Sequence, residues 1–368
     1  MLIKQIENKS IVWFQDNNEY IVVEPLIAEI LSLLKSNVNE KQIINQLFNN
    51  VNIPYEKIEN LIFDVKNLLK THKKEEVISK QFKIPNNFEF SKFYKINELI
   101  IKVDYQSDYE MFLVHPKFSH LEIKETKKIT HYYSVYTHKD HIIFSIDGKL
   151  IGNWHIKDVH YFQGKFSMKL VEHIHQKNED EWMGVFHASA ISNNEESMLF
   201  LGDSGNGKST SLALLQANDF TCLADDFVPI DIEKKEVFSF PSAISIKKKS
   251  LETLLPIYPE LESSAEYHFK RLNKIVRYLI PNNSNYTKHL PCKALVFIKY
   301  EKDSGLNIKE ISKIDAFEQL VPDSWLSPIK DNAEKFLIWF SKLPCYQLTY
   351  SDNKKMIETV HKIFNDEL

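Results

Sequence analysis

The chain reads Gly202-Asp203-Ser204-Gly205-Asn206-Gly207-Lys208-Ser209 at the point that decides its fold. Glycine, four residues and then Gly-Lys-Ser form the pattern of a phosphate-binding P-loop. Glycine lets backbone N–H groups turn toward one point and leaves no Cβ in the way of a phosphate. The chain has only eight glycines, and three of them fall within this stretch. The pattern therefore predicts a nucleotide site, and the plainer alternative is a glycine turn between a strand and a helix.

The residues on either side of this stretch favour the nucleotide site. Residues 197–201 have the pattern of a buried strand that enters the loop, and residues 210–216 that of a helix whose N-terminus points at the phosphates. Lys208 is expected to reach the β- and γ-phosphates of ATP, and Ser209 to ligate Mg²⁺. The residues of this segment expected to contact ATP are Gly202, Asp203, Ser204, Gly205, Asn206, Gly207, Lys208, Ser209 and Thr210.

An aspartate pair, Asp225-Asp226, follows the loop helix at the end of another expected strand. One carboxylate there can hold Mg²⁺, while the other accepts a proton from an attacking hydroxyl. The alternative is an aspartate pair that begins a turn. His187 is expected on the strand before the loop, on the face that carries Ser189. A lone strand histidine is more often a partly buried side chain than a functional group.

These elements together resemble the HPr kinase/phosphorylase family. In that family a histidine stands fifteen residues before the first loop glycine, as His187 does here, and Ala-Asp-Asp follows the loop helix, as at residues 224–226. The resemblance implies a catalytic domain of the HPr-kinase and PEP-carboxykinase type, in which Lys208 is catalytic. It implies that Asp226 is the base, that His187 pairs with an active-site carboxylate, and that Ser209 and Asp225 hold the metal. Which aspartate takes which role stays open.

The sequence also departs from that family. The family's loop usually continues with Glu where this chain has Thr210, and the family has a later glycine-rich segment, whereas Gly305 is the single glycine here after the loop. HPr as substrate, phosphorolysis and the family's hexamer are therefore not expected. The chain is more similar to divergent HPr-kinase-related kinases found with peptide-modification genes. In these a basic stretch should contact phosphate, and the candidates, each of which could equally be a solvated surface charge, are Lys247, Arg271, Lys274 and Arg277.

Residues 1–72 resemble a PqqD-like winged-helix domain, which binds leader peptides of ribosomally made, modified peptides. Two short expected strands, at 10–14 and 20–23, precede three helical patterns. The second strand could take an added peptide strand at its edge, while the third helix walls the groove. The alternative, a winged helix that binds DNA, is disfavoured because the unit is not basic.

Composition and patterning complete the domain assignment. A linker is expected over 73–95, an antiparallel β-rich region over 96–180 and the catalytic domain over 181–368, which together give an α/β (α+β) protein. The chain has 368 residues and a net charge of −4, which argues against general nucleic-acid binding. No secretory segment or membrane span is expected, and three scattered cysteines fit neither zinc nor a disulfide framework. These features favour a cytoplasmic protein.

The leading hypothesis is an ATP- and Mg²⁺-dependent kinase of a Ser or Thr hydroxyl. Its acceptor would be a precursor peptide whose leader binds residues 1–72. A first alternative is a kinase of a small hydroxylated metabolite such as free serine, and a second is a non-catalytic nucleotide-binding module that recruits a leader peptide. The intact Lys208, Ser209 and aspartate pair argue against the second alternative. The oligomeric state stays open, a homo-oligomer included.

Overall fold

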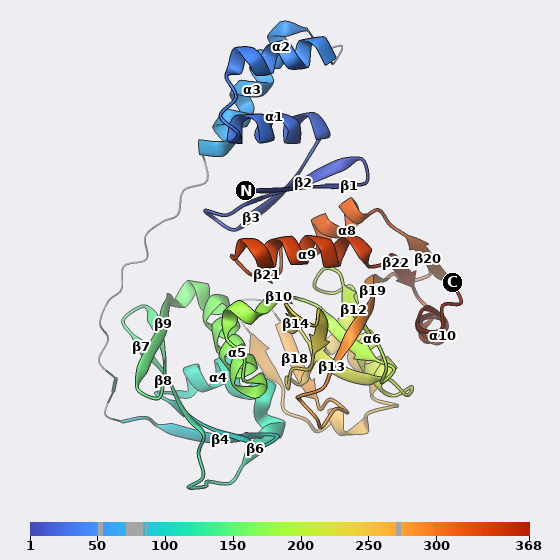
Figure 1. Cartoon of the computed structure of the whole chain (residues 1–368). Coiled ribbons are helices and arrows are strands. Elements are labelled where there is room, and N and C mark those ends of the chain that lie inside the picture. The colour runs from blue at the N-terminus through green and yellow to red at the C-terminus, as the bar shows by residue number, and fades with distance from the viewer. Residues whose placement is uncertain (51–53, 71–83, 86, 270–273) are drawn as a thin grey trace.

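The computed structural model describes residues 1–50, 54–70, 84–85, 87–269 and 274–368. Over these residues the chain is a mixed α/β protein with sheets of three, ten, three and six strands (Figure 1). None of its described helices has the length and apolar character needed to span a bilayer.

The N-terminal unit consists of a three-stranded sheet and three helices. The antiparallel sheet has the order β1 (Leu2–Ile6), β2 (Lys9–Phe14), β3 (Glu19–Val23), of which β1 was not predicted. The helices are α1 (Pro25–Lys35), α2 (Glu40–Asn50) and α3 (Tyr55–Lys70). Asn39 caps α2, because its Oδ1 accepts the N–H of Lys41 at 2.9 Å. Alternate residues of β2 face two different cores, since Val12 and Phe14 pack with the three helices while Ile11 packs on the opposite side.

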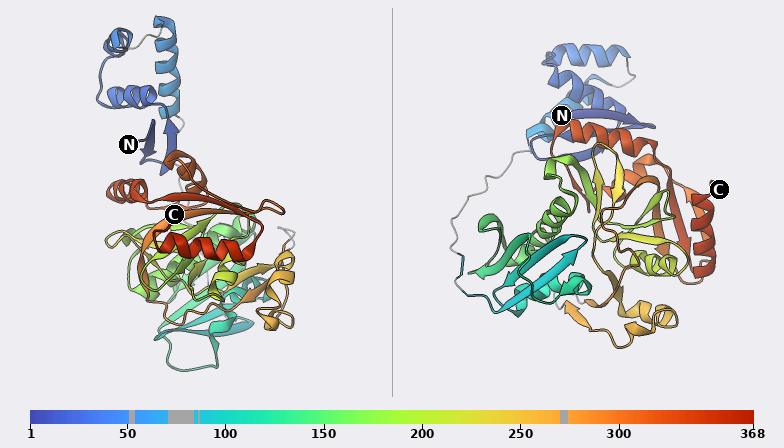
Figure 2. Two further views of the ribbon diagram at one scale, coloured as in Figure 1. Left: turned by 90° about the vertical axis from the view of Figure 1, so that its right-hand side faces the viewer. Right: turned by 60° about the horizontal axis from the view of Figure 1, so that its bottom comes forward.

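That opposite side of the N-terminal sheet rests on the C-terminal part of the chain. The ring of Tyr20 lies 5.9 Å from that of Phe317 and 5.7 Å from that of Phe336. Asn18 Nδ2 donates to Leu326 O at 2.7 Å, and Lys313 N–H donates to Glu7 Oε1 at 2.8 Å. The N-terminal sheet therefore lies directly against α8 (Lys313–Leu320) and α9 (Lys330–Lys342), with α2 and α3 on its far side (Figures 1 and 2).

The second unit is a six-stranded sheet packed against two helices. Its elements are β4 (Phe90–Ile96), β5 (Leu99–Tyr105), α4 (Asp108–Phe118), β6 (Glu122–Ile123), β7 (His131–His138), β8 (His141–Ile146), β9 (Lys149–His155) and α5 (Val159–His175). Its first strand begins at Phe90 rather than at residue 96, inside the expected linker, of which residues 73–83 and 86 lie outside the described part. The sheet is not wholly antiparallel as predicted, because α4 crosses over between β5 and β7, which pair in parallel.

The remaining residues form a ten-stranded sheet and a smaller one. Their elements up to the small sheet are β10 (Trp182–Phe186), β11 (Ser189–Ser192), β12 (Ser197–Leu201), α6 (Lys208–Gln216), β13 (Thr221–Asp225), β14 (Val228–Asp231), β15 (Glu236–Phe238), β16 (Ile244–Lys247), α7 (Leu251–Leu254), β17 (Tyr267–Phe269) and β18 (Lys274–Leu279). The later ones are β19 (His289–Tyr300), β20 (Leu306–Glu310), α8, β21 (Trp325–Leu326), α9, β22 (Cys345–Tyr350) and α10 (Asn353–Phe364). The small sheet has the order β16-β18-β17.

Strand β12, which leads to the glycine-rich loop, lies inside the large sheet. It pairs antiparallel with β11 and parallel with β19. Its residues alternate between two cores, with Leu199 and Leu201 on the side of α9 and Met198 and Phe200 on the side of α6 and α10. Because both faces are covered, the position of the loop at its end is fixed by packing on both sides.

The stretch 185–191, predicted as one strand, is two strands. Strand β10 pairs with β14 and β21, whereas β11 pairs with β12 and β13. The chain bends between them at His187 and Ala188, where the N–H of Ala188 donates to Phe186 O at 2.9 Å. His187 therefore lies in a bend and is exposed, not on a strand face as expected.

Candidate functional site

The glycine-rich loop joins β12 to α6, as the sequence predicts. Gly202 has φ +134°, and a Cβ there would lie 2.8 Å from Ile298 O, so no other residue fits this position. Gly207 has φ +97° and packs against Tyr300 and Tyr350, which a Cβ would approach to 3.3 Å. The loop is tied to β19, because the N–H of Tyr300 donates to Asn206 O at 2.9 Å. The shape of the loop is thus set by close contacts and a hydrogen bond with other strands as well as by its own sequence.

Lys208 begins helix α6 and folds back over the loop. Its ammonium donates to Gly202 O, and Asp203 O lies 3.5 Å from its Nζ. The side chain is 6% exposed, and burial lowers its pKa although the charges of Asp226 and Asp225 act in the opposite direction. An ammonium held by loop carbonyls beside the free N–H groups of a helix N-terminus forms a site suited to an anion.

Asp225 is a buried carboxylate beside Ser209. It ends β13, is 1% exposed, and its two oxygens accept the Ser209 hydroxyl at 3.2 and 3.0 Å. It also accepts the Ser189 hydroxyl at 2.6 Å and the N–H of Ser245 at 3.1 Å. Burial, followed by the neighbouring charge of Asp226, raises the pKa of the Asp225 carboxyl. Four hydrogen bonds therefore fix the direction of the Asp225 carboxylate, and a bound cation would stabilise its charged form.

Asp226 differs from its neighbour in backbone conformation and in exposure. Its φ is +63°, in the left-handed region that few non-glycine residues adopt, and such backbone strain is often found at functional sites. The side chain is 23% exposed. Burial favours its neutral form, but nearby positive charges outweigh burial and hold its pKa below the usual range. In decreasing order of effect these charges belong to Lys117, His187, Lys274 and Lys208.

The other candidates of the basic stretch divide into two groups. Lys247 lies at the loop, where its Nζ donates to Ser204 Oγ at 2.8 Å. Lys274 is close enough to Asp226 to lower its pKa. Arg277, by contrast, is not brought to the loop. Its guanidinium pairs with Glu266 at 3.0 Å and also donates to the carbonyls of Leu261 and Glu262.

The separation of Arg277 from Lys274 follows from strand geometry. Both lie on β18, which was not predicted, and three residues apart on a strand place side chains on opposite faces. Thr210 is also otherwise engaged, because its Oγ1 lies 2.7 Å from Ser250 Oγ. Arg271 lies outside the described residues.

Two residues at the site were missed by sequence reasoning. Lys117, near the end of α4, places its Nζ 3.6 Å from Asp226 Oδ2. Asp323, just before β21, is close enough to Lys208 to raise its pKa. Neither residue lies near the loop in sequence or belongs to a recognisable motif, so no local signal could have identified it.

The donor set suits Mg²⁺ rather than a metal held by protein alone. Within the described ranges no three or more His, Cys, Asp or Glu side chains gather as a metal site. Mg²⁺, however, commonly takes one or two protein oxygens and completes its shell with phosphates and water. The Ser209 hydroxyl and the Asp225 carboxylate, in contact with each other at the loop, fit that requirement.

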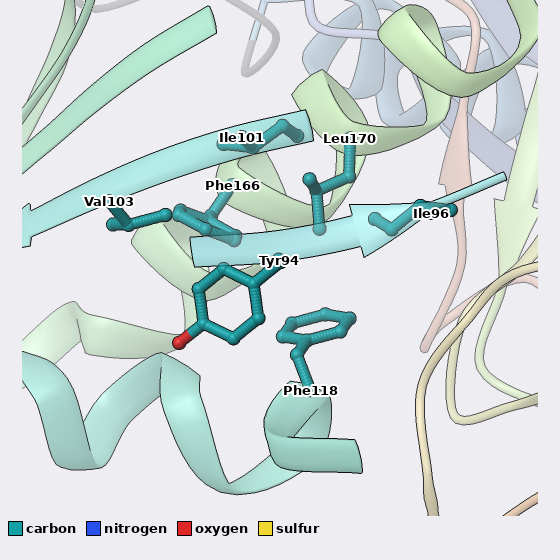
Figure 3. A pocket seen from close by; sticks show the side chains of 7 residues that line it. All are labelled: Tyr94, Ile96, Ile101, Val103, Phe118, Phe166 and Leu170. Carbon is teal, nitrogen blue, oxygen red and sulfur yellow. The ribbon is translucent and has the colours of Figure 1, made fainter. Parts of the chain in front are cut away.

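The cavity shown in Figure 3 is not part of this site. It lies in the core of the second unit and is lined by Tyr94, Ile96, Ile101, Val103, Phe118, Phe166 and Leu170. Its volume of about 10 Å³ holds no more than a water molecule, so it is a packing gap.

Comparison with known proteins gives no relative from which a function could be carried over: no protein-family model and no curated protein matches this sequence. The functional reading therefore depends on the loop, the two carboxylates and the cations around them. Together they form a site suited to an anion, at which the side chain of Asp226 stays partly exposed to solvent.

Proposed function

We propose that the chain is an ATP- and Mg²⁺-dependent kinase that phosphorylates a Ser or Thr hydroxyl of a ribosomally made precursor peptide. In this proposal it has an HPr-kinase-related P-loop domain and a PqqD-like N-terminal domain. The observation that carries the proposal is the contact of Ser209 with the buried Asp225 at the loop, beside a second carboxylate, Asp226, that is partly exposed to solvent. One carboxylate is then available to the metal and the other to the acceptor.

The phosphates and the metal ion each have partners in this proposal. The loop N–H groups and the N-terminus of α6 bind the phosphates, and Lys208 exchanges its loop carbonyls for the β- and γ-phosphates. Lys247, held at Ser204, adds a second ammonium. Ser209 and Asp225 would hold Mg²⁺, which when bound neutralises charge on the β- and γ-phosphate oxygens.

Transfer needs little covalent chemistry from the protein. The acceptor oxygen bonds to the γ-phosphorus, the bond from that phosphorus to the β–γ bridging oxygen breaks, and ADP leaves. The hydroxyl proton passes to the Asp226 carboxylate. Because the surrounding cations keep this carboxylate ionised, its main contribution is to orient the hydroxyl as a hydrogen-bond acceptor. His187 stands near it and adds to its positive surroundings.

Leader binding is assigned to strand β3. Among the residues that the structure describes, the sheet order β1-β2-β3 leaves one side of β3 without a partner strand, which suits the addition of a peptide strand. DNA binding is disfavoured by charge, since residues 1–72 contain seven Lys and nine Asp or Glu, a difference of −2. A peptide held there would present its core residues to a catalytic domain that lies against the same sheet.

The test measures transfer of labelled phosphate from MgATP to a panel of acceptors. The panel contains a precursor peptide from the gene neighbourhood, the same peptide without its leader, and free L-serine. We expect labelling of the full peptide, a higher KM without the leader, and loss of labelling in Lys208→Ala but not in Lys249→Ala, an exposed lysine. Labelling of serine alone would favour the metabolite kinase, and ATP binding without transfer the recruitment module.

The leader should be removed from the peptide rather than the N-terminal domain from the enzyme. Deleting residues 1–72 would uncover the faces of α8 and α9 on which Tyr20 rests, including Phe317 and Phe336. The truncated enzyme would then expose apolar surface, and a change in KM could not be assigned to recruitment.

A further inference from the structure

Lys117 comes from the second unit but lies at the aspartate pair of the third. Its Nζ is 3.6 Å from Asp226 Oδ2. The side chains of Lys117 and Asp226 are 37% and 23% exposed, so the ion pair faces solvent at the site instead of lying inside the interface. An acceptor that approaches Asp226 from solvent would therefore meet Lys117 as well.

Several contacts lock the main chain of Lys117 to the segment that carries Asp226. Lys117 O accepts the N–H of Ala243 at 2.9 Å. The next ring, Phe118, packs edge-on against Phe240 at 5.9 Å, and Phe240 packs against Phe227 at 4.7 Å. Because Phe227 directly follows Asp226, both ends of the ion pair are fixed to one aromatic cluster.

Stability does not explain this arrangement. A half-exposed ion pair is worth about 0–1 kcal/mol, too little for it to be needed to hold the two units together. The direction of the Asp226 carboxylate, meanwhile, depends on the charged groups that lie against its oxygens. Lys117 engages Oδ2, and the other groups near enough for a positive charge to lower the pKa of Asp226 are His187, when protonated, Lys274 and Lys208.

We propose that Lys117 is a positioning residue of the transfer reaction. It holds Oδ2 of Asp226, so that Oδ1 faces the acceptor hydroxyl. The second unit, β4 through α5, is thereby a part of the catalytic machinery and not a spacer between recruitment and chemistry. This inference rests on the proposed kinase activity. It adds Lys117 to the site as a residue that affects the rate of phosphate transfer through Asp226.

The test compares Lys117→Met, Lys117→Arg and a control, Lys127→Met, at an exposed lysine of the same unit. The probe is MgATP, with water as the acceptor in a hydrolysis assay and with the best acceptor of the panel above. We expect kcat to fall about 10- to 100-fold in Lys117→Met, the range expected when a reacting group is misplaced. Lys117→Arg should keep most of the rate, and Lys127→Met all of it.

Affinity for MgATP and thermal stability separate positioning from other roles. Both should stay near wild-type values in Lys117→Met. An unchanged kcat would overturn the inference, as would an equal loss in Lys117→Arg, because charge would then not matter. A parallel loss of MgATP affinity would make Lys117 a phosphate ligand instead. A wild-type protein that neither hydrolyses nor transfers phosphate would overturn the kinase proposal and this inference with it.

Discussion

Tyr20 offers a two-sided test of how the N-terminal domain is held. Its ring contacts Phe317 and Phe336, while its hydroxyl is buried with no hydrogen-bond partner among the described residues. An unsatisfied buried hydroxyl costs about 1–3 kcal/mol. Tyr20→Phe removes that cost and keeps the ring, so we expect it to raise the unfolding temperature by about 1–3 °C.

Tyr20→Ala should have the opposite effect. It removes the ring from contact with Phe317 and Phe336 across the interface, and aromatic pairs contribute about 0.5–1.5 kcal/mol each beyond burial. A total near 2 kcal/mol would raise the population of the undocked domain roughly 30-fold. The expected result is faster amide exchange in both β3 and α9.

Hydrogen–deuterium exchange and scanning calorimetry measure these effects. Tyr132→Ala serves as the control, because Tyr132 lies on strand β7 with 49% of its surface exposed. A less stable Tyr20→Phe would refute the assignment of an unpartnered hydroxyl. Unchanged exchange of α9 in Tyr20→Ala would refute the idea that this ring holds the domain in place.

Three further predictions concern the site. Asp226→Asn should lower kcat about 10²- to 10⁴-fold with MgATP affinity retained, whereas Asp225→Asn should weaken the Mg²⁺ dependence in a metal titration; the reverse result would exchange their roles. Lys247→Ala should weaken MgATP binding several-fold and Arg277→Ala should not, as isothermal calorimetry would show. Burial raises the folded pKa of Asp225, so wild type loses stability as pH rises through it and Asp225→Asn does not. We expect the free energy of unfolding of Asp225→Asn, measured in urea with EDTA and relative to wild type, to be about 1–3 kcal/mol higher at pH 8 than at pH 5. Asp226 has a lowered pKa, so its own titration changes stability only below this pH range.

The parts of the fold that were predicted are those that local sequence determines. The mixed α/β class and the strand–loop–helix around Lys208 follow from short patterns of apolar residues and glycines. Helix α4 was missed because its apolar residues form no clear stripe and Pro116 lies within it. The bend at His187 was missed because β10 and β11 together look like one continuous apolar run.

The site could be predicted only where its residues are close in sequence. Lys208, Ser209 and the aspartate pair are recognised by spacing, but Lys117 and Asp323 reach the site through the packing of distant elements. Lys274 and Arg277 could not be told apart, because only the strand β18 places them on opposite faces. The basic stretch thus indicates which residues could contact phosphate, and the strand shows which of them lie on the face toward the site.

The docking of the N-terminal sheet changes how recruitment would operate. The sequence predicts a linker between the first two units, yet β3 rests on α9 through Tyr20, and Asn18 Nδ2 donates to the carbonyl of Leu326 in β21. Strand β21 pairs with β10, and β10 ends one residue before His187, which lies near Asp226. The N-terminal sheet that would bind a leader is therefore connected to the surroundings of Asp226 through β21 and β10. Because the leader site is fixed relative to the Asp226 carboxylate, the peptide itself must span the distance between the two, and the enzyme does not move to shorten it. The spacing between leader and acceptor residue would then have a sharp lower limit, whereas a longer spacer would weaken transfer only gradually, as the effective concentration of a tethered group falls slowly with length.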